Sequence, residues 1–276
     1  MNKLNINKII FLAICYLSTS IFAIENLGAV SAATGGAGVG VLEEVDGTYL
    51  NPASIALFPK KSFAISFSKF HTNIHMTDNG RDAFFPAGLS YTKTDENQMQ
   101  TQAFHLTLAY AIAENFSIGL DTGLREITRT GIDNTFRQTV VTPGMFFQIS
   151  DSFSSGLVWK NKPLTNTDLP DALDQSSTLA LGFGYIYEKF AKFRADIESA
   201  SNEKTDKLIY KVGLETYLND WIITRIGYQN DNVRAQNFFT AGLGFAGPQF
   251  GLHYAYQAEA RNSRDTLHTI DLNIPF

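Results

Sequence analysis

Residues 104–124 read FHLTLAYAIAENFSIGLDTGL, two runs with apolar side chains at nearly every second position around a short polar break. Alternate side chains of a β-strand point to opposite faces, so each run has one large apolar face and one small or polar face. The break at Ala113-Glu114-Asn115 is short enough for a hairpin turn. The stretch therefore predicts two antiparallel strands with one face suited to lipid.

The same hairpin pattern recurs to the end of the chain. Further alternating runs flank short turns at 150–152, 188–189, 218–220 and 246–248, and a last run ends at Phe276. An aromatic residue follows each turn: Phe116, Phe153, Phe190, Trp221 and Phe250. Aromatic residues gathered at strand ends are typical of the interfacial girdle of a membrane barrel.

Longer polar segments join the opposite ends of these hairpins: Ile127–Thr135, Asn161–Ser176, Ala200–Asp206, Gln229–Gln236 and Glu259–Asp265. Short turns at one rim and long polar loops at the other are typical of the periplasmic and extracellular sides of an outer-membrane barrel. We therefore predict an all-β fold, in which residues 62–276 form a transmembrane antiparallel β-barrel.

Charge on the second face distinguishes this barrel from a soluble one. A lipocalin-like barrel or a β-sandwich has an apolar interior. Here Lys192, Arg194, Asp196 and Glu198 share one face of a single run. Such charge cannot line a dry core, whereas a wet lumen tolerates it. The side chains predicted to charge the lumen are Asp121, Arg125, Arg194, Lys211, Glu215 and Arg225.

The strand number follows from parity. Both ends of the barrel are expected on the periplasmic side, which requires an even count. Runs at Ser62–Phe70 and Phe84–Lys93 must both lead outward, so a weak returning strand is needed near His71–Thr77, with a turn at Asp78-Asn79-Gly80. This gives about fourteen strands. Twelve is the alternative, if Phe84–Lys93 folds into an extracellular loop.

Residues 1–23 predict export to the cell outer membrane of a Gram-negative envelope. Lys3 and Lys8 accompany the apolar run Ile9–Leu17, and small residues lead to Ala23, which is the order of a secretory signal peptide. The run is too short to span a bilayer, which needs about 20 apolar residues. Cys15 is the only cysteine, so cleavage after Ala23 would leave no disulfide or thiolate metal ligand.

Residues 24–61 form a separate, glycine-rich segment without alternation. Glycine permits positive φ and close backbone approach, and Asn51 can cap a short helix that begins at Pro52. The acidic stretch 43–46 could pair with lumen cations or simply be solvated. We predict a compact plug with these characteristic residues: Gly35, Gly36, Gly38, Asn51, Pro52 and Ala53.

Two short motifs of this segment carry a resemblance. Residues 33–39, ATGGAGV, and then Leu50-Asn51-Pro52-Ala53 resemble the family of long-chain fatty-acid transporters (FadL-type) and its shorter PorV-like relatives. The resemblance implies a fourteen-stranded barrel with the N-terminal segment inside as a hatch, and passage of a hydrophobic small molecule such as a fatty acid. The PorV-like relatives imply the alternative, a barrel that docks secretion or surface partner proteins without transporting a solute.

The resemblance also implies a lateral opening, because a kink in the third strand of the fatty-acid transporters opens the wall toward lipid. By our count the third strand is Phe84–Lys93. Proline cannot donate to the ladder, and glycine eases a bend. The residues expected at the opening are Phe84, Phe85, Pro86 and Gly88. A kink at Pro143-Gly144 and a tolerated bulge near a rim are the alternatives.

The last run resembles the signal that the outer-membrane insertion machinery recognises. We therefore expect two partners, that machinery and the outer-membrane lipid. Apolar side chains alternate up to a terminal aromatic residue: Ile270, Leu272, Ile274 and Phe276.

Other function classes find little support. The net charge of −5 disfavours a nucleic-acid partner. His105 and His253 face the lumen by parity with no serine marked by its context, so we expect no enzyme. His71 and His75 lack a further ligand for a metal, and cofactor-binding motifs are absent. A plug would fill so narrow a barrel, which disfavours an open diffusion porin.

Overall fold

The computed structural model describes residues 28–43, 46–58, 60–79, 85–96, 98–130, 132–165, 177–200, 207–261 and 266–276. The predicted signal peptide lies outside them. Three short helices come first: α2 (Ala29–Ala33), α3 (Gly47–Leu50) and the 3-10 helix η1 (Pro52–Leu57). The strands are β1 (Lys61–Ser68), β2 (His71–Asp78), β3 (Ala87–Glu96), β4 (Met99–Ala113), β5 (Phe116–Arg129), β6 (Ile132–Gln148), β7 (Phe153–Lys160), β8 (Lys162–Pro163), β9 (Thr178–Tyr187), β10 (Ala191–Ala200), β11 (Leu208–Tyr217), β12 (Ile222–Asp231), β13 (Gln236–Ala246), β14 (Gly251–Glu259) and β15 (Thr266–Pro275).

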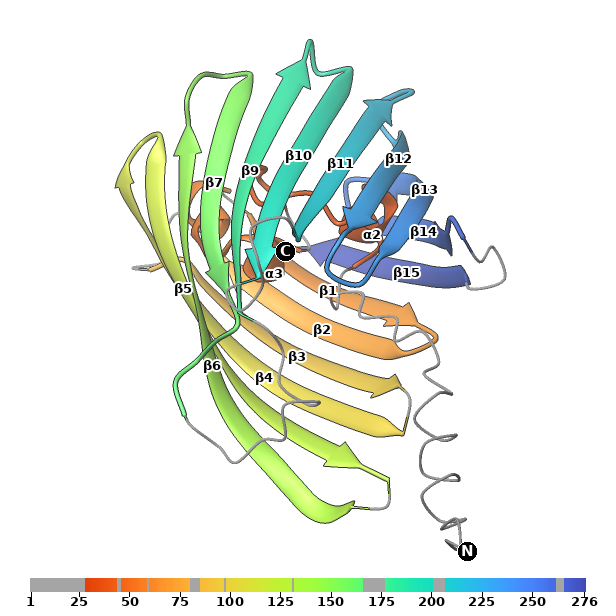
Figure 1. The fold of residues 1–276 in the computed structure, drawn as a ribbon. Helices are drawn as coiled ribbons and strands as arrows, with labels where there is room; N and C mark the ends of the chain where they lie inside the picture. The colour runs from red at the N-terminus through yellow and green to blue at the C-terminus, as the bar shows by residue number, and fades with distance from the viewer. Residues whose placement is uncertain are drawn as a thin grey trace, which may run out of the picture.

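Fourteen of these strands close into an antiparallel barrel (Figure 1). β1 pairs with β15, and β5 pairs with β6, so each of the fourteen strands has a partner strand on both sides within the described residues. The two-residue β8 is an additional strand beside β6. The weak returning strand is present as β2, and β3 pairs with both of its neighbours. The prediction of fourteen strands is confirmed, and the twelve-strand alternative is wrong.

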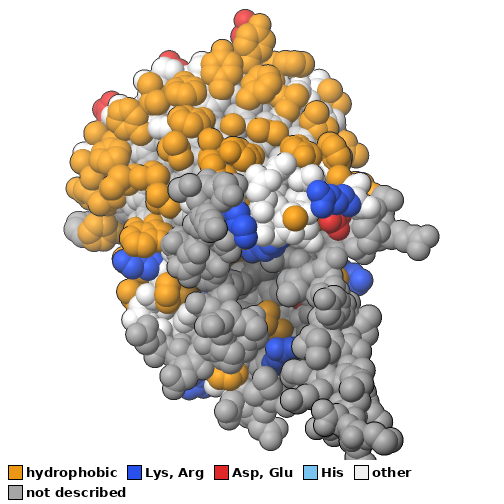
Figure 2. Space-filling view, viewed as in Figure 1, with side chains coloured by type: hydrophobic (Ala, Val, Ile, Leu, Met, Phe, Trp, Pro, Cys, Tyr) orange, Lys and Arg blue, Asp and Glu red, His pale blue; other side chains and the backbone are white. Residues whose placement is uncertain are grey.

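Alternation gives the wall its two faces. On β4, the outward Phe104 is 63% exposed and the inward Thr107 is 1% exposed. Hydrophobic side chains cover the outer face over β9–β12 (Figure 2), as a lipid-facing surface requires. Closure satisfies the backbone within the ladder, which is the condition for a sheet to cross a membrane. No helix among the described residues is long and apolar enough to cross one.

The two rims differ in their connections. The short turns are confirmed after β4, β6, β9, β11 and β13, and we call this end the short-turn rim and the opposite end the long-loop rim. The predicted loop Ile127–Thr135 is wrong, because β5 continues to Arg129 and β6 begins at Ile132. β-branched residues favour strand here, and the ion pair between Arg137 Nε and Glu126 Oε1 at 2.8 Å joins the extended strands.

Deletion of Phe276 should impair barrel assembly. Ile270, Leu272 and Ile274 face outward on β15, and the Phe276 amide donates to the Lys61 carbonyl at 3.1 Å, extending the β1–β15 closure. An unpaired backbone group in lipid costs roughly several kcal/mol. Heat-modifiable gel migration and membrane yield measure the effect, with Phe276→Tyr as the control that keeps both the amide and the aromatic ring. Normal membrane yield of the deleted chain would contradict this expectation.

Candidate functional site: the barrel lumen and its N-terminal segment

Residues 28–43 and 46–58, here called the lumenal segment, lie inside the barrel (Figure 1). Helix α2 packs against β12–β15, and η1 packs against β4–β6. The chain therefore crosses the lumen from one side of the wall to the other. All six residues predicted for the plug, Gly35, Gly36, Gly38, Asn51, Pro52 and Ala53, belong to this segment.

Local chemistry explains the shape of the lumenal segment. Gly35 and Gly36 have φ values of +68° and +74°, which only glycine adopts readily, and the Gly36 amide returns to the Ser31 carbonyl at 2.8 Å to end α2. Asn51 is extended and accepts from the Ala53 amide at 3.1 Å through Oδ1, while Pro52 occupies the first position of η1. This is the predicted cap.

A set of lumen-facing glycines on the strands seats this segment against the wall. At each of them, an added Cβ would meet atoms of the lumenal segment at less than 3 Å. These seats are Gly88, Gly119, Gly144, Gly156, Gly182, Gly184, Gly213, Gly227 and Gly242. Since real Cβ atoms essentially never approach so closely, the wall and the segment are matched in shape around most of the barrel.

Hydrogen bonds from wall side chains hold the backbone of the segment. Ser117 Oγ donates to the Ala53 carbonyl at 2.7 Å, Ser154 Oγ donates to the Gly40 carbonyl at 2.7 Å, and Thr240 Oγ1 donates to the Ala33 carbonyl at 2.9 Å. Asn51 Nδ2 bridges the Val39 carbonyl and the Met145 carbonyl of β6, both at 2.9 Å. Each bond gives a backbone carbonyl a side-chain donor, which ties the segment to the wall or to itself.

Buried carboxylates bind the amides of the segment. Asp196 of β10 accepts from the Gly38 and Val39 amides at 2.7 and 3.0 Å. Asp271 of β15 accepts from the Ala29 amide at 2.5 Å. Within the segment, Asp46 accepts from Gly28 and Ser31, and burial raises the pKa of its carboxyl group above the ordinary value.

All six predicted lumen charges are buried on the inner face of the wall: Asp121, Arg125, Arg194, Lys211, Glu215 and Arg225. Arg194, Glu215 and Arg225 form one network, which also holds Glu43 of the lumenal segment. Lys211 pairs with Glu198 at 2.9 Å and Arg125 donates to Asn161 at 2.7 Å. Glu44 lies outside the described residues.

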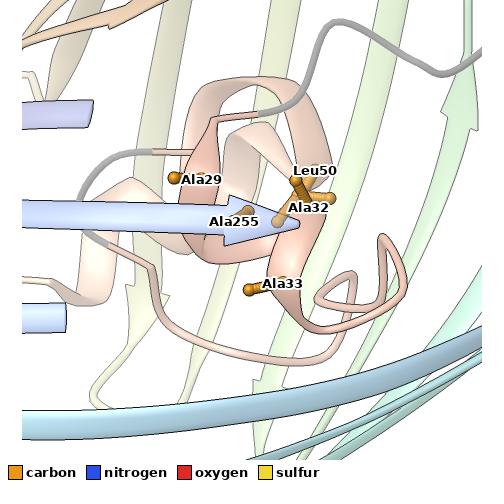
Figure 3. Packing of buried hydrophobic residues seen from close by; sticks show 5 residues of the cluster. All are labelled: Ala29, Ala32, Ala33, Leu50 and Ala255. Carbon is orange, nitrogen blue, oxygen red and sulfur yellow. The ribbon is translucent and has the colours of Figure 1, made fainter. Parts of the chain in front are cut away.

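Apolar contacts accompany the polar ones. Ala29, Ala32, Ala33 and Leu50 of the segment form a buried cluster with Ala255 of β14 (Figure 3). A second cluster joins Val39 to Val158 and Ala180 on β7 and β9. The lumen around the segment is thus neither wholly apolar nor wholly filled by charge.

The wall is closed where the lateral opening was predicted within β3. Ala87 and Gly88 pair in unbroken register with β2 and β4, and the Pro86 carbonyl accepts from the Ala109 amide at 2.9 Å. Gly88 is required for a different reason: its added Cβ would lie 2.8 Å from Thr48 Cγ2 of the lumenal segment. Phe84 lies outside the described residues.

The alternative kink at Pro143-Gly144 differs between its two sides, because pairing with β7 stops at Gly144 and resumes with β8 at Val141. On the β5 side both residues keep their register with Leu120 and Gly119, and Gly144 is one of the seats.

His105 Nδ1 lies 2.8 Å from Asp121 Oδ2, and an added Cβ at Gly123 would meet the His105 ring at 2.7 Å, so the ring leans toward β5. Among the described residues, no three or more His, Cys, Asp or Glu side chains gather as a metal site would require.

Comparison with known proteins shows which solved structures share the fold of this barrel. No protein-family model and no curated protein sequence matches the chain. The Ralstonia pickettii toluene transporter TbuX matches with a TM-score of 0.65 and 12% identity, over 92% of this chain and 98% of that one. The Pseudomonas putida toluene transporter TodX matches with a TM-score of 0.64 and 11% identity, over 93% and 99%. The chain has a FadL-type fold.

A Pseudomonas aeruginosa FadL homologue agrees with a TM-score of 0.58 and 11% identity, over 92% of this chain and 98% of that one. The FadL-type resemblance of residues 33–39 and 50–53 is thereby confirmed for the fold. The docking role of the PorV-like relatives finds no support in these matches. What sequence reasoning missed in the FadL-type barrel is the set of glycine seats, whose only signal is glycine at inward positions of alternating runs.

Proposed function

We propose that this protein is an outer-membrane transport barrel for a hydrophobic small molecule, and that the lumenal segment is its hatch. The observation that carries the proposal is that the chain's own N-terminal segment occupies the lumen and is held by separable contacts, such as Asp196 with Gly38 and Ser117 with Ala53. The fold is shared with proteins named as toluene transporters. The short-turn rim is then periplasmic, and residues 1–23 direct export.

The surroundings of the hatch favour transport over docking. Apolar side chains adjoin it at Val39 and Leu50, so a passing molecule would meet apolar as well as polar surface once the segment moves. We place any exit into lipid beside Phe85, ahead of the bond between the Pro86 carbonyl and the Ala109 amide at which the closed part of the wall begins. Phe85 is 49% exposed, and its ring lies 6.0 Å from that of Tyr110, which provides an apolar lip.

Expression in a Gram-negative host that lacks its own transporter of hydrophobic compounds tests the proposal. The lipopolysaccharide leaflet of such a cell is the barrier, so labelled toluene or a long-chain fatty acid should enter faster when the barrel is present. Purified outer membranes must contain the folded, heat-modifiable protein in equal amount to a control barrel of unrelated function. Uptake equal to that control for both compounds would contradict the transport role.

A further inference from the structure

One histidine differs from the other four, because it lies on the outer face of the wall. His268 of β15 is exposed, whereas His71, His75 and His253 are buried and the side chain of His105 is 11% exposed. An ionisable side chain on the lipid face destabilises a barrel at the bilayer midplane and is tolerated close to an interface. His268 therefore indicates an interfacial level at which its ring meets polar groups.

This level is the long-loop rim, where β14, β15, β1 and β2 lie side by side in that order (Figure 1). The β1–β15 ladder ends at the pair Ser68–Thr269. The next residues at this end are therefore Lys69 and His268, and both are exposed. Lys61 begins β1 at the opposite end, eight residues from Lys69. Eight strand residues span roughly 26 Å along the strand, or roughly 20 Å in height at the usual tilt, which is close to the ~25 Å apolar band of such barrels. Lys61 and Lys69 thus mark the two edges of the band.

Two tyrosines of β14 contact the His268 ring on this outer face. The Tyr254 hydroxyl lies 2.7 Å from His268 Nδ1. Tyr256 faces His268 across the ladder, and the centres of the two rings lie 5.4 Å apart. Within the part of the chain that the structure describes, His268 Nε2 and the Tyr256 hydroxyl have no hydrogen-bond partner. Because all three side chains are exposed, these two groups can bind an oxygen of an external molecule.

Lys69 adds a positive charge that no carboxylate of the described residues neutralises. Its Nζ lies 4.8 Å from the centre of the Phe70 ring and forms no ion pair with a described residue. Asp95 reaches the same turn only through its amide, which donates to the Phe70 carbonyl at 2.8 Å. Lys61 at the other edge of the band differs, because its Nζ lies 3.2 Å from Asp78 Oδ2. The long-loop edge of this sector thus keeps a positive charge that an external anion can offset.

An apolar groove on the outer face reaches β1 and β2, the two strands that the Lys69 turn joins. Its volume is about 600 Å³, and its lining includes Ile74, Met76, Leu89 and Phe104. Met76, Leu89 and Phe104 are exposed on the outer face of the wall, so the groove opens toward lipid and away from the lumen. Such a lining suits a hydrocarbon chain.

We infer that Lys69, Tyr254, Tyr256 and His268, here called the interfacial cluster, bind the phosphate-bearing headgroup of lipid A in the outer leaflet, and that an acyl chain of the same lipid lies in the groove. Ammonium, imidazole N–H and phenol groups donate to phosphate oxygens, and basic clusters at a membrane edge recognise anionic headgroups. The groove favours a lipid over a free anion, which has no chain to place there. The inference rests on the proposed function only for the orientation that puts the long-loop rim outside.

Native mass spectrometry of the full chain, refolded in detergent without host lipid, tests the inference. Lipid A with both phosphates should bind saturably, and removal of both phosphates should weaken binding by about tenfold or more, because charge-assisted contacts are lost. A variant that combines Lys69→Gln with His268→Gln should lose this preference for phosphate. Lys162→Gln is the matched control, because Lys162 on β8 also lies over an aromatic ring, with Nζ 4.1 Å from the centre of Trp159. Its preference should equal that of the parent chain.

Equal affinity for lipid A with and without its phosphates, or an unchanged preference in the double variant, would overturn the inference. Displacement of lipid A by inorganic phosphate at matched ionic strength would overturn it as well, because the site would then take a free anion. Should the double variant fail to fold, as heat-modifiable migration reports, the comparison of the two lipids on the parent chain still decides. Uptake of toluene or a fatty acid is a separate measurement, and its absence beside phosphate-selective lipid A binding contradicts the transport role alone.

Discussion

Gly156→Ala should unseat the lumenal segment and open the lumen to small ions. The added Cβ would clash with the Val39 carbonyl oxygen and lie 2.6 Å from Asn51 Nδ2. Neither the Val39 backbone nor the Asn51 side-chain amide, which donates two hydrogen bonds, can move aside without breaking a contact. Overpacking of this kind costs about 1–3 kcal/mol, which corresponds to a roughly fivefold to hundredfold larger population of the displaced segment. Conductance of the purified barrel in planar bilayers measures it.

Gly251→Ala is the matched control. Gly251 also faces the lumen, but the atoms nearest its added Cβ are His253 Nε2 at 3.1 Å and wall atoms at 3.5 Å or more, so the lumenal segment is untouched. Conductance should stay at the parent level there. Equal conductance of Gly156→Ala and Gly251→Ala would show that the seats do not hold the lumen closed.

Asn51→Ala should loosen the same contact through a residue of the lumenal segment itself. Asn51 is fully buried and supplies three bonds: Nδ2 to the Val39 and Met145 carbonyls, and Oδ1 from the Ala53 amide. Removal of the side chain takes a hydrogen-bond partner from each of these backbone groups. Each group left unsatisfied lowers the stability of the seated segment by roughly 1–3 kcal/mol. Hydrogen–deuterium exchange of residues 38–53 should accelerate by about tenfold or more, while exchange of the barrel ladders stays slow.

Asn219→Ala provides the comparison for this substitution. Asn219 caps the short turn before β12 by accepting from the Trp221 and Ile222 amides, and both of these bonds lie within the turn. Its loss should speed exchange in that turn alone. Unchanged exchange over residues 38–53 in Asn51→Ala would show that the bridge to Met145 does not hold the segment.

The barrel could be predicted from sequence because the two-residue alternation of its side chains follows directly from strand geometry and from contact with lipid. Lipid forces every outward position to be apolar, as at Leu106 and Leu108, and parity required the weak strand that became β2. The Asn51 cap was equally local, since a residue and its next two neighbours define it. The error at residues 127–135 arose because polar side chains beyond the membrane fit a strand as well as a loop.

The seating of the lumenal segment could not be predicted in this way. Gly156 and Val39 meet only after the barrel has closed, and a glycine at an inward position carries no sign of what will face it. Asp196 read as one lumen charge among several, yet it binds the Gly38 and Val39 amides. Gly88 was interpreted as part of a strand kink, but in the structure glycine is needed there because Thr48 of the lumenal segment lies against it.

The central claim, that the segment must move for a solute to pass, can be tested by locking it. Cys15 is the only natural cysteine, so an Ala53→Cys, Ser117→Cys pair can tether η1 to β5, where Ser117 Oγ now contacts the Ala53 carbonyl. A Ser62→Cys, Thr77→Cys pair links two wall strands instead, where the two hydroxyls lie 2.9 Å apart. Gel mobility before and after reduction reports whether each disulfide has formed.

Uptake of labelled toluene or fatty acid by cells carrying these variants is the deciding measurement. We predict that the oxidised Ala53–Ser117 tether abolishes uptake, that a membrane-impermeant reductant restores it, and that the wall tether leaves it unchanged in both states. Undiminished uptake through a fully oxidised Ala53–Ser117 tether would contradict the account.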